Sequence, residues 1–275
     1  MLVSPMNGIP GHHSTVPIAL CLGGMDPSAG AGILRDVQVV SSLGVYPMAL
    51  CTAETIQNGS ACLRIAPPGL PPDEGFAALR PHLLSGHWGA KLGLCAVQPG
   101  LMGALARTIH EAAPLARIWD PVLGPSSGAG LHDRETLLAL AEALLPSGGW
   151  VVSPNLPEAR TLLGGPTSDP AALARPWLEL GAEAVWLKGG HGEGGDIQDL
   201  WITAGSVLSL GAHPRLPGEL RGTGCAVASA WLALRLRGAD AVRAASEAGA
   251  WLRRHWERAA APGGYGRPAL LPECP

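Results

Sequence analysis

Residues 18–44 read IALCLGGMDPSAGAGILRDVQVVSSLG and contain the pattern that decides the fold. The apolar run at its start predicts a buried strand over residues 18–24. A glycine-rich turn follows, and residues 32–44 then show the spacing of an amphipathic helix that ends at Gly44. A buried strand, a glycine turn and a helix in this order predict the first half of a βαβ unit.

The same alternation of apolar runs and helical patterns continues along most of the chain. Further strands are predicted at residues 46–56, 88–95, 116–121, 149–155 and 183–190. Further helices are predicted up to residue 84 and at residues 100–113, 134–145, 156–164, 225–238 and 239–256. Because such crossover units build parallel sheets, the sequence predicts an α/β fold with a mostly parallel sheet that is covered by helices on both faces.

Three finer features accompany this pattern. Residues 189–212 predict short strands joined by glycine turns, as in a hairpin or flap at the edge of a sheet. Pro176 is expected to end or kink the helix in which it lies. We find no linker inside the chain, so we expect one domain over residues 16–275, preceded by a flexible tail over residues 1–15.

The composition argues against several classes of protein. Hydrophobic residues make up 47% of the 275 residues and charged residues 15%, with a net charge of −3, which indicates a packed chain. No run of lysine and arginine offers a track for a phosphate backbone, so we expect no nucleic-acid partner. No run of about 18 apolar residues occurs, so we expect no membrane span. The cysteines form no Cys-x-x-Cys pair, which is typical of a reducing, cytoplasmic location.

Unusual residues follow the predicted strands, at the edge of a parallel sheet where ligands bind. In chain order they are Gly24, Asp26, Gln57, Asp120, Asn155, Glu158, Lys188, Gly189, Gly222, Thr223, Gly224 and Cys225. Each also has a purely structural explanation. The glycines permit tight turns, Asp26 can cap a helix, and Asn155 with Glu158 can form an Asx turn and a first-turn carboxylate. Their shared position is what favours a binding site.

The turn at residues 222–225 opens an apolar helix. The backbone amides of Gly222, Thr223 and Gly224 lie at a helix N-terminus, where they can stabilise a transferred phosphoryl group. The same helix N-terminus is expected to lower the pKa of Cys225, so that its thiol can act as a base.

The residues after the other strands supply the remaining parts of a phosphoryl-transfer site. That reaction needs donors around a phosphate, a cation against the spreading charge and a base near the acceptor hydroxyl. Asp120, Asn155 and Glu158 can place Mg²⁺, partly through water, and Lys188 can neutralise nucleotide phosphates.

Other motifs carry little weight. Gly190, Gly192 and Gly195 match G-x-G-x-x-G, but that segment runs into a predicted strand rather than a helix, so we interpret it as a flexible turn. The chain has no Walker-type loop, no G-x-S-x-G and no H-x-x-x-H, which argues against a P-loop enzyme, a serine hydrolase of the α/β type and a zinc site.

On these residues the sequence resembles the hydroxymethylpyrimidine/phosphomethylpyrimidine kinases of thiamine biosynthesis, in the ribokinase-like superfamily. The segments that carry the resemblance are GGMDPSAGAGILRDVQVVSSLGVYPMALCTAETIQNG, AKLGL, DPVLGPSSG, SPNLPEA, WLKGGH and GTGC, in that family's order. The resemblance implies a ribokinase-like three-layer αβα sandwich. It also implies a kinase that uses ATP and Mg²⁺ to phosphorylate 4-amino-5-hydroxymethyl-2-methylpyrimidine and then its monophosphate, and a homodimer.

The resemblance also implies a role for each motif residue. The predicted pyrimidine contacts are Gly24, Asp26, Gln57 and Leu94. The predicted nucleotide contacts are Asn155, Lys188 and Gly189, and the predicted metal ligands are Asp120 and Glu158. The predicted catalytic residues are Cys225, Gly222, Thr223 and Gly224. Sugar and nucleoside kinases of the superfamily usually carry aspartate where this chain has cysteine, so the cysteine indicates the vitamin-kinase branch.

The sequence departs from the family pattern at three places. Leu220 and Arg221 replace a threonine-histidine pair, Leu94 replaces a methionine, and Pro125 follows a changed DPVM segment. Arg221 and Pro125 bear on the second phosphorylation, and Arg221 could serve as an extra phosphate clamp. Two alternatives stay open: a pyridoxal or pyridoxine kinase of the same branch, and a non-catalytic pyrimidine-binding sensor.

Overall fold

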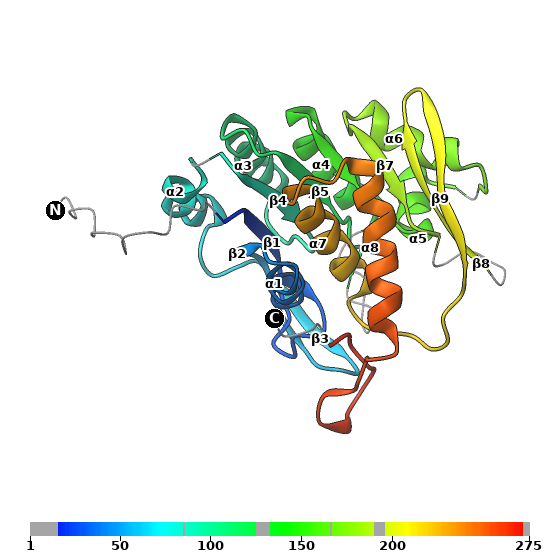
Figure 1. Ribbon diagram of the computed structural model, residues 1–275. Coiled ribbons are helices and arrows are strands. Elements are labelled where there is room, and N and C mark those ends of the chain that lie inside the picture. The colour runs from blue at the N-terminus through cyan, green and yellow to red at the C-terminus, as the bar shows by residue number, and fades with distance from the viewer. Residues whose placement is uncertain (1–15, 85, 125–132, 166, 190–195, 272–275) are drawn as a thin grey trace.

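The strands of the computed structural model, which describes residues 16–84, 86–124, 133–165, 167–189 and 196–271, form one sheet in the order β3-β2-β1-β4-β5-β6-β7-β8-β9 (Figure 1). The strands are β1 (Ile18–Met25), β2 (Tyr46–Gln57), β3 (Cys62–Ala66), β4 (Trp88–Leu92), β5 (Ala116–Trp119), β6 (Trp150–Val152), β7 (Ala184–Leu187), β8 (Asp196–Thr203) and β9 (Ser206–Pro214). Neighbouring strands from β2 to β7 run parallel, and antiparallel pairs lie at both edges. The predicted mostly parallel sheet is confirmed.

Helices cover both faces of this sheet (Figure 1). One layer holds α2 (Pro72–Leu83), α3 (Pro99–Glu111), α4 (Arg134–Leu144), α5 (Leu156–Leu163) and α6 (Pro170–Glu179), and the other holds α1 (Gly32–Ser42), α7 (Thr223–Leu236) and α8 (Ala241–Trp256). Successive side chains of a strand point to opposite faces. In β1, therefore, Leu20 and Leu22 join one apolar cluster, whereas Ala19 and Cys21 join the other. The predicted three-layer arrangement is confirmed.

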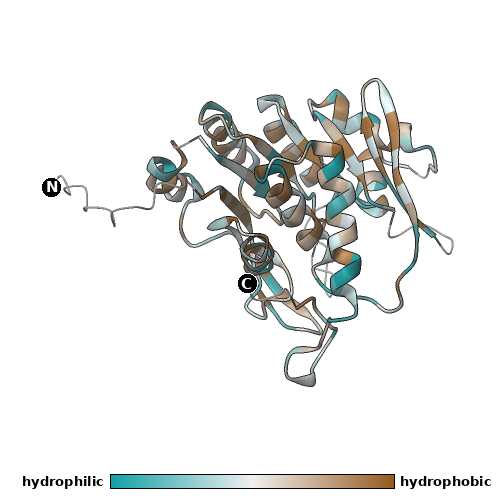
Figure 2. Ribbon diagram, viewed as in Figure 1, coloured by the Kyte–Doolittle hydropathy of each residue, from teal (hydrophilic) through white to brown (hydrophobic). Residues whose placement is uncertain are grey.

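Helix α7 packs closely on β4 because Gly89 has no side chain where Leu232 of the helix meets the strand. A Cβ added to Gly89 of β4 would lie 2.7 Å from Leu232 Cδ1 and 2.8 Å from the carbonyl oxygen of Ala116. Figure 2 shows α7 as almost wholly hydrophobic, whereas α8 alternates between hydrophilic and hydrophobic residues. Helix α7 is thus the inner helix of its layer, and its N-terminus is held firmly above the sheet.

The edges of the sheet differ from the prediction in detail. The hairpin predicted over residues 189–212 is present as β8 and β9, but its first glycines, at 190–195, lie outside the described residues. The antiparallel strand β3 was not predicted, because the residues of CLRIA show no strong alternation and three of the five are only partly buried. Strand β4 ends at Leu92, three residues earlier than predicted.

Of the two outcomes predicted for Pro176, an end or a kink of its helix, the end does not occur. Helix α6 continues through Pro176 to Glu179, and the amide of Leu180 still donates to the Pro176 carbonyl at 3.2 Å. Proline removes one backbone donor from the helix. Burial of Leu173, Ala174 and Trp177 in the core outweighs that loss.

Two expectations from the composition can be compared with the structure. Among the described residues, Cys21, Cys51, Cys62 and Cys225 are free thiols, as the cysteine pattern predicts. Within the same part of the chain, no helix has the length and apolar character needed to cross a membrane.

A buried ion pair joins the sheet to the layer that holds α7. The Lys91 ammonium of β4 donates to both carboxylate oxygens of Asp36 on α1 at 2.7 Å, and the Ser229 hydroxyl of α7 donates to Asp36 Oδ1 at 2.8 Å. All three residues are fully buried. Burial raises the pKa of Asp36, whereas the charge of Lys91 acts against that rise. The pair therefore depends on both charges being present.

We expect Lys91→Met to lower the free energy of unfolding by about 3–5 kcal/mol, because it leaves the Asp36 carboxylate buried without a partner. Restoring neutrality with Lys91→Met/Asp36→Leu should recover part of that loss. Chemical denaturation of each variant measures the effect. Arg243→Met, which removes an exposed ion pair with Glu247 at 2.7 Å, is the control and should change little. A single Lys91 variant as stable as the parent protein would contradict the prediction.

Candidate phosphoryl-transfer site

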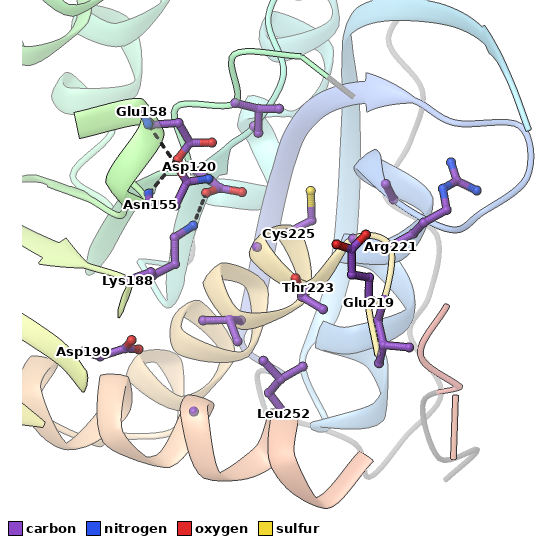
Figure 3. Close-up of a pocket in the computed structure, with 18 of the residues that line it drawn as sticks. Asp120, Asn155, Glu158, Lys188, Asp199, Glu219, Arg221, Thr223, Cys225 and Leu252 are labelled. Atoms are coloured by element: carbon purple, nitrogen blue, oxygen red, sulfur yellow. Dashed lines mark hydrogen bonds and ion pairs between the residues drawn. The ribbon is translucent and has the colours of Figure 1, made fainter. Parts of the chain in front are cut away.

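A cavity of about 700 Å³ opens at the carboxyl ends of the parallel strands (Figure 3). Its wall contains all of the predicted site residues except Asp26 and Gly189. This placement follows from topology, because the ends of parallel strands meet at one edge of the sheet. Residues that lie 200 positions apart in the sequence, such as Gly24 and Gly224, therefore share one cavity.

The turn before α7 contributes backbone rather than side chains. Gly222 is the N-cap of α7 with φ +70°, and a Cβ there would clash with the carbonyl oxygen of Gly30. No side chain caps the helix N-terminus. A helix N-terminus that faces a cavity is a binding site for anions, because its first amides carry a partial positive charge. Gly222, Thr223 and Gly224 thus lie at an uncapped helix N-terminus on the cavity wall.

An ion pair lies directly beside this turn. Lys188 Nζ donates to Asp120 Oδ1 at 2.6 Å. A Cβ on Gly224 would lie 3.2 Å from Asp120 Oδ2 and 3.4 Å from Lys188 Nζ, so the glycine lets the pair approach the helix. Burial lowers the pKa of Lys188, but Asp120 and Glu158 outweigh burial and raise it. Lys188 therefore stays cationic next to the amides, as a phosphate-neutralising group requires.

Asn155 and Glu158 form a reciprocal cap at the start of α5. The Glu158 amide donates to Asn155 Oδ1 at 2.9 Å, and the Asn155 amide donates to Glu158 Oε2 at 2.7 Å. Burial raises the pKa of Glu158 to about 8. The structural explanation of this pair, helix capping, is thus correct. Both residues nevertheless line the cavity beside Lys188, as Figure 3 shows, so capping also orients them toward a ligand.

The expected low pKa of Cys225 was wrong. Burial, opposed by the Lys91 ammonium and reinforced by Asp36, raises the pKa of this thiol to about 11. The favourable effect of a helix N-terminus on a thiolate is worth less than the loss of its hydration. Without ligands, Cys225 is therefore a neutral thiol at the centre of the site, between Lys188 and Arg221 (Figure 3).

Two predicted contacts serve the local structure instead. Asp26 is fully buried, and its carboxylate accepts hydrogen bonds from the amides of Ser28 and Ala31 at 2.9 Å, which shapes the turn before α1. The Gly189 amide donates to Asp199 Oδ1 at 2.8 Å, and the residue does not face the cavity. Asp26 and Gly189 thus support residues of the cavity wall without lining the cavity themselves.

The structure also adds cavity residues that the motifs did not identify. The buried pair of Lys91 and Asp36 lines the cavity, Asp199 of β8 lines it too, and Arg221 donates to Gln57 on the side away from Lys188. Burial raises the pKa of Asp199. Lys91 and Asp36 lie in segments that carry the family resemblance, and Arg221 directly precedes Gly222, but none of the three was assigned a place in the cavity because they become neighbours only through the fold.

Proteins that are similar to this chain belong to one family of kinases. A family model described as phosphomethylpyrimidine kinase matches residues 26–269. The chain is 32% identical, over 86% of its length and 88% of the relative, to the hydroxymethylpyrimidine/phosphomethylpyrimidine kinase of Rhizobium meliloti (strain 1021). It is 33% identical to the thiamine biosynthesis bifunctional protein ThiED of Geobacter sulfurreducens, where the match covers 82% of this chain but 46% of the relative.

Solved structures agree with the fold. The pyridoxal kinase from Staphylococcus aureus in complex with AMP-PCP and pyridoxal has a TM-score of 0.76 and 22% sequence identity, with coverage of 92% of this chain and 93% of that one. At this identity the likeness supports the fold only. The family model and the curated relatives go further: the chain belongs to the phosphomethylpyrimidine kinase family. The family predicted from the sequence, and with it a phosphotransferase, is confirmed.

We expect alkylation of Cys225 by iodoacetamide to rise about tenfold per pH unit between pH 7 and pH 10, because only the thiolate reacts. With a pKa of about 11 the thiol is almost wholly protonated over this range. Mass spectrometry of the peptide that contains Cys225 measures the rate, and the Cys225→Ala protein identifies that peptide. A rate that levels off below pH 9 would mean that the helix N-terminus prevails over burial.

Proposed function

We propose that this chain transfers the γ-phosphoryl group of ATP to the hydroxymethyl group of 4-amino-5-hydroxymethyl-2-methylpyrimidine, and then phosphorylates the monophosphate. The observation that carries the proposal is the position of the turn at residues 222–225. It separates a charged side with Asp120 and Lys188 from a less charged side with Gln57 and Leu94. A site that joins a nucleotide to a small aromatic acceptor needs these two sides. The solved pyridoxal kinase with AMP-PCP in a similar fold supports ATP as the donor.

On the nucleotide side, the chain supplies positive charge and oxygen ligands. The amides of Thr223 and Gly224 bind the transferred phosphoryl group, and Lys188 neutralises charge on the nucleotide phosphates. No cluster of three or more potential metal-ligating side chains occurs among the described residues. Two carboxylates, those of Asp120 and Glu158, are enough for Mg²⁺, because proteins usually hold this ion with one or two carboxylates together with phosphates and water. When bound, Mg²⁺ would neutralise phosphate charge as it spreads during transfer.

On the acceptor side, the wall is flat and partly apolar. A Cβ on Gly24 would lie 2.9 Å from Leu94 Cδ2, so the glycine lets the Leu94 side chain pack against it, and both residues line the cavity. The Gln57 amide, with one acceptor and two donors, offers polar recognition at the ring edge. This combination suits an aminopyrimidine.

Cys225 lies where the proton of the acceptor hydroxyl has to go. A thiol with a raised pKa gives few thiolates, but each is a stronger base than an ordinary thiolate. Phosphoryl transfer passes through a loose transition state, so the hydroxyl proton leaves late and a small thiolate fraction is enough. The Lys91 ammonium lowers the pKa of Cys225 and so increases that fraction.

The oligomeric state, the location, Pro125 and Arg221 were also the subject of predictions from the sequence. The homodimer and the cytoplasmic location stay predictions. Pro125, which bears on the second phosphorylation, lies outside the described residues, whereas Leu123 and Gly124 line the cavity. Arg221 donates to Asp26 and Gln57, away from Lys188, which argues against its predicted use as a phosphate clamp.

Turnover of ATP with Mg²⁺ tests the function directly. The acceptors are 4-amino-5-hydroxymethyl-2-methylpyrimidine, its monophosphate and pyridoxine, each assayed separately with product identified by mass spectrometry. We expect both pyrimidines to be phosphorylated, and no product without Mg²⁺. Turnover of pyridoxine alone would assign the chain to the vitamin B6 branch, and binding without turnover would support a sensor.

We expect Cys225→Ala to lower kcat by about 10²–10⁴-fold, the usual contribution of a positioned base, and to leave the KM for ATP nearly unchanged. The matched control is Cys62→Ala, which removes a partly buried thiol outside the cavity. Steady-state kinetics with the aminopyrimidine measures both. An alanine variant with the parent kcat would remove the thiol from the mechanism.

A further inference from the structure

Arg221 is a buried cation beside the acceptor side of the cavity. Its Nη2 lies 3.0 Å from Asp26 Oδ2 and 3.5 Å from Gln57 Oε1, and its Nη1 lies 3.0 Å from Ser28 Oγ. The side chain is 4% exposed and that of Asp26 is fully buried. In Figure 3, Arg221 lies on the opposite side of Cys225 from Asp120 and Lys188. Its position associates it with the acceptor rather than with the nucleotide.

The backbone around Arg221 is fixed from two directions. The Arg221 amide donates to the carbonyl oxygen of Pro268 at 2.9 Å, and the Arg267 amide donates to the carbonyl oxygen of Gly59 at 2.9 Å. The C-terminal segment 265–269 therefore links the turn before α7 to the loop that follows Gln57, the last residue of β2. Gly30 leaves room for the guanidinium, since a Cβ there would lie 2.7 Å from Nη1.

A guanidinium donates hydrogen bonds and accepts none. The amide oxygen of Gln57 must therefore face Arg221, and the amide NH₂ is left for the cavity. The contact of 3.5 Å is long and uses one of the two lone pairs of Oε1, so the oxygen can still accept a second bond. Arg221 thus fixes which end of the Gln57 amide donates to a ligand.

We propose that Arg221 is a specificity-determining positioning residue that acts through Gln57. It selects acceptors whose ring nitrogen offers a free lone pair beside an exocyclic amine. This inference rests on the proposed function, because it concerns the acceptor of that same site. It goes further by stating why an aminopyrimidine is chosen over a hydroxypyridine.

The hydrogen-bond patterns of the two acceptors differ. A 4-aminopyrimidine presents a ring nitrogen that accepts and an amine that donates, which match the NH₂ and the oxygen of Gln57 as Arg221 orients them. The 3-hydroxypyridine ring of pyridoxine moves its phenolic proton to the ring nitrogen at neutral pH, so that nitrogen donates. Two donors then face each other, and a site built for one pattern rejects the other because polar groups are left unpaired.

The test compares kcat/KM for the aminopyrimidine and for pyridoxine in four test variants and one control variant. Arg221→Lys keeps the charge beside Asp26 but loses the fixed fork. We expect it to lower the ratio of the two kcat/KM values about tenfold or more, with the KM for ATP unchanged. Gln57→Ala should lower the ratio similarly, and Gln57→Ala/Arg221→Lys should lower it no further than Gln57→Ala. Arg237→Lys, whose guanidinium binds the Leu43 carbonyl oxygen at 2.7 Å outside the cavity, is the control.

Gln57→Glu is the fourth variant, and it leaves Arg221 intact. A carboxylate still accepts from Arg221 but has no donor for the cavity, so it should favour the protonated ring nitrogen and shift the ratio toward pyridoxine. This variant keeps the test decisive if Arg221→Lys fails to fold, which thermal melting reports.

The outcomes separate this inference from the proposed function. Calorimetric binding of each acceptor without ATP provides a second readout. Binding of the aminopyrimidine without turnover overturns the kinase function while the same variants still test the selection. Turnover of the aminopyrimidine with a ratio that Arg221→Lys and Gln57→Glu leave unchanged overturns the role of Arg221. An effect of Arg221→Lys that persists in full on the Gln57→Ala background would mean that Arg221 acts without Gln57, and would also overturn it.

Discussion

The buried ion pair between Lys91 and Asp36 is the interaction on which the rest of the site depends. It joins the central strand β4 to α1, and through Ser229 it reaches α7, whose N-terminus forms the site. Two charges in a low-dielectric interior tolerate little displacement, because separation would leave each one without its partner. The pair therefore ties α7 to the sheet one turn after Cys225 and keeps a cation close enough to lower the pKa of that thiol.

Much of the fold follows from the sequence, because the signals are local and repeated. The apolar run at 18–24 and the helix after it lie in one βαβ unit, and the same rhythm predicts each parallel strand. The residues of β3 carry no such signal, because this strand forms only through its pairing with β2. The helix through Pro176 is a similar case. Contacts of Trp177 with the core, which include Trp119 at a ring distance of 5.5 Å, decide the outcome there, and no local pattern reports them.

The site could be predicted as a set of residues but not as a chemical environment. Topology brings Asp120, Lys188 and the turn at 222–225 to one edge, and motif spacing was enough to anticipate that. The raised pKa of Cys225 and the use of Asp26 as a turn former depend on burial and on partners far away in the chain. Arg221 illustrates the same limit. Its neighbours Gln57 and Pro268 become visible only once the strands and the C-terminal segment are in place.

Burial has two opposite effects on this site, and both arise from the same low dielectric. It strengthens the attraction of Lys188 and the helix amides for phosphate oxygens, which favours transfer. It also holds Cys225 as a neutral thiol, which delays the proton step. A thiol that ionises rarely reacts rarely with oxidants or electrophiles while the site is empty. Under the proposed function, Cys225 would act as a base only toward an acceptor hydroxyl that lies against the sulfur, where a rare but strong base is sufficient.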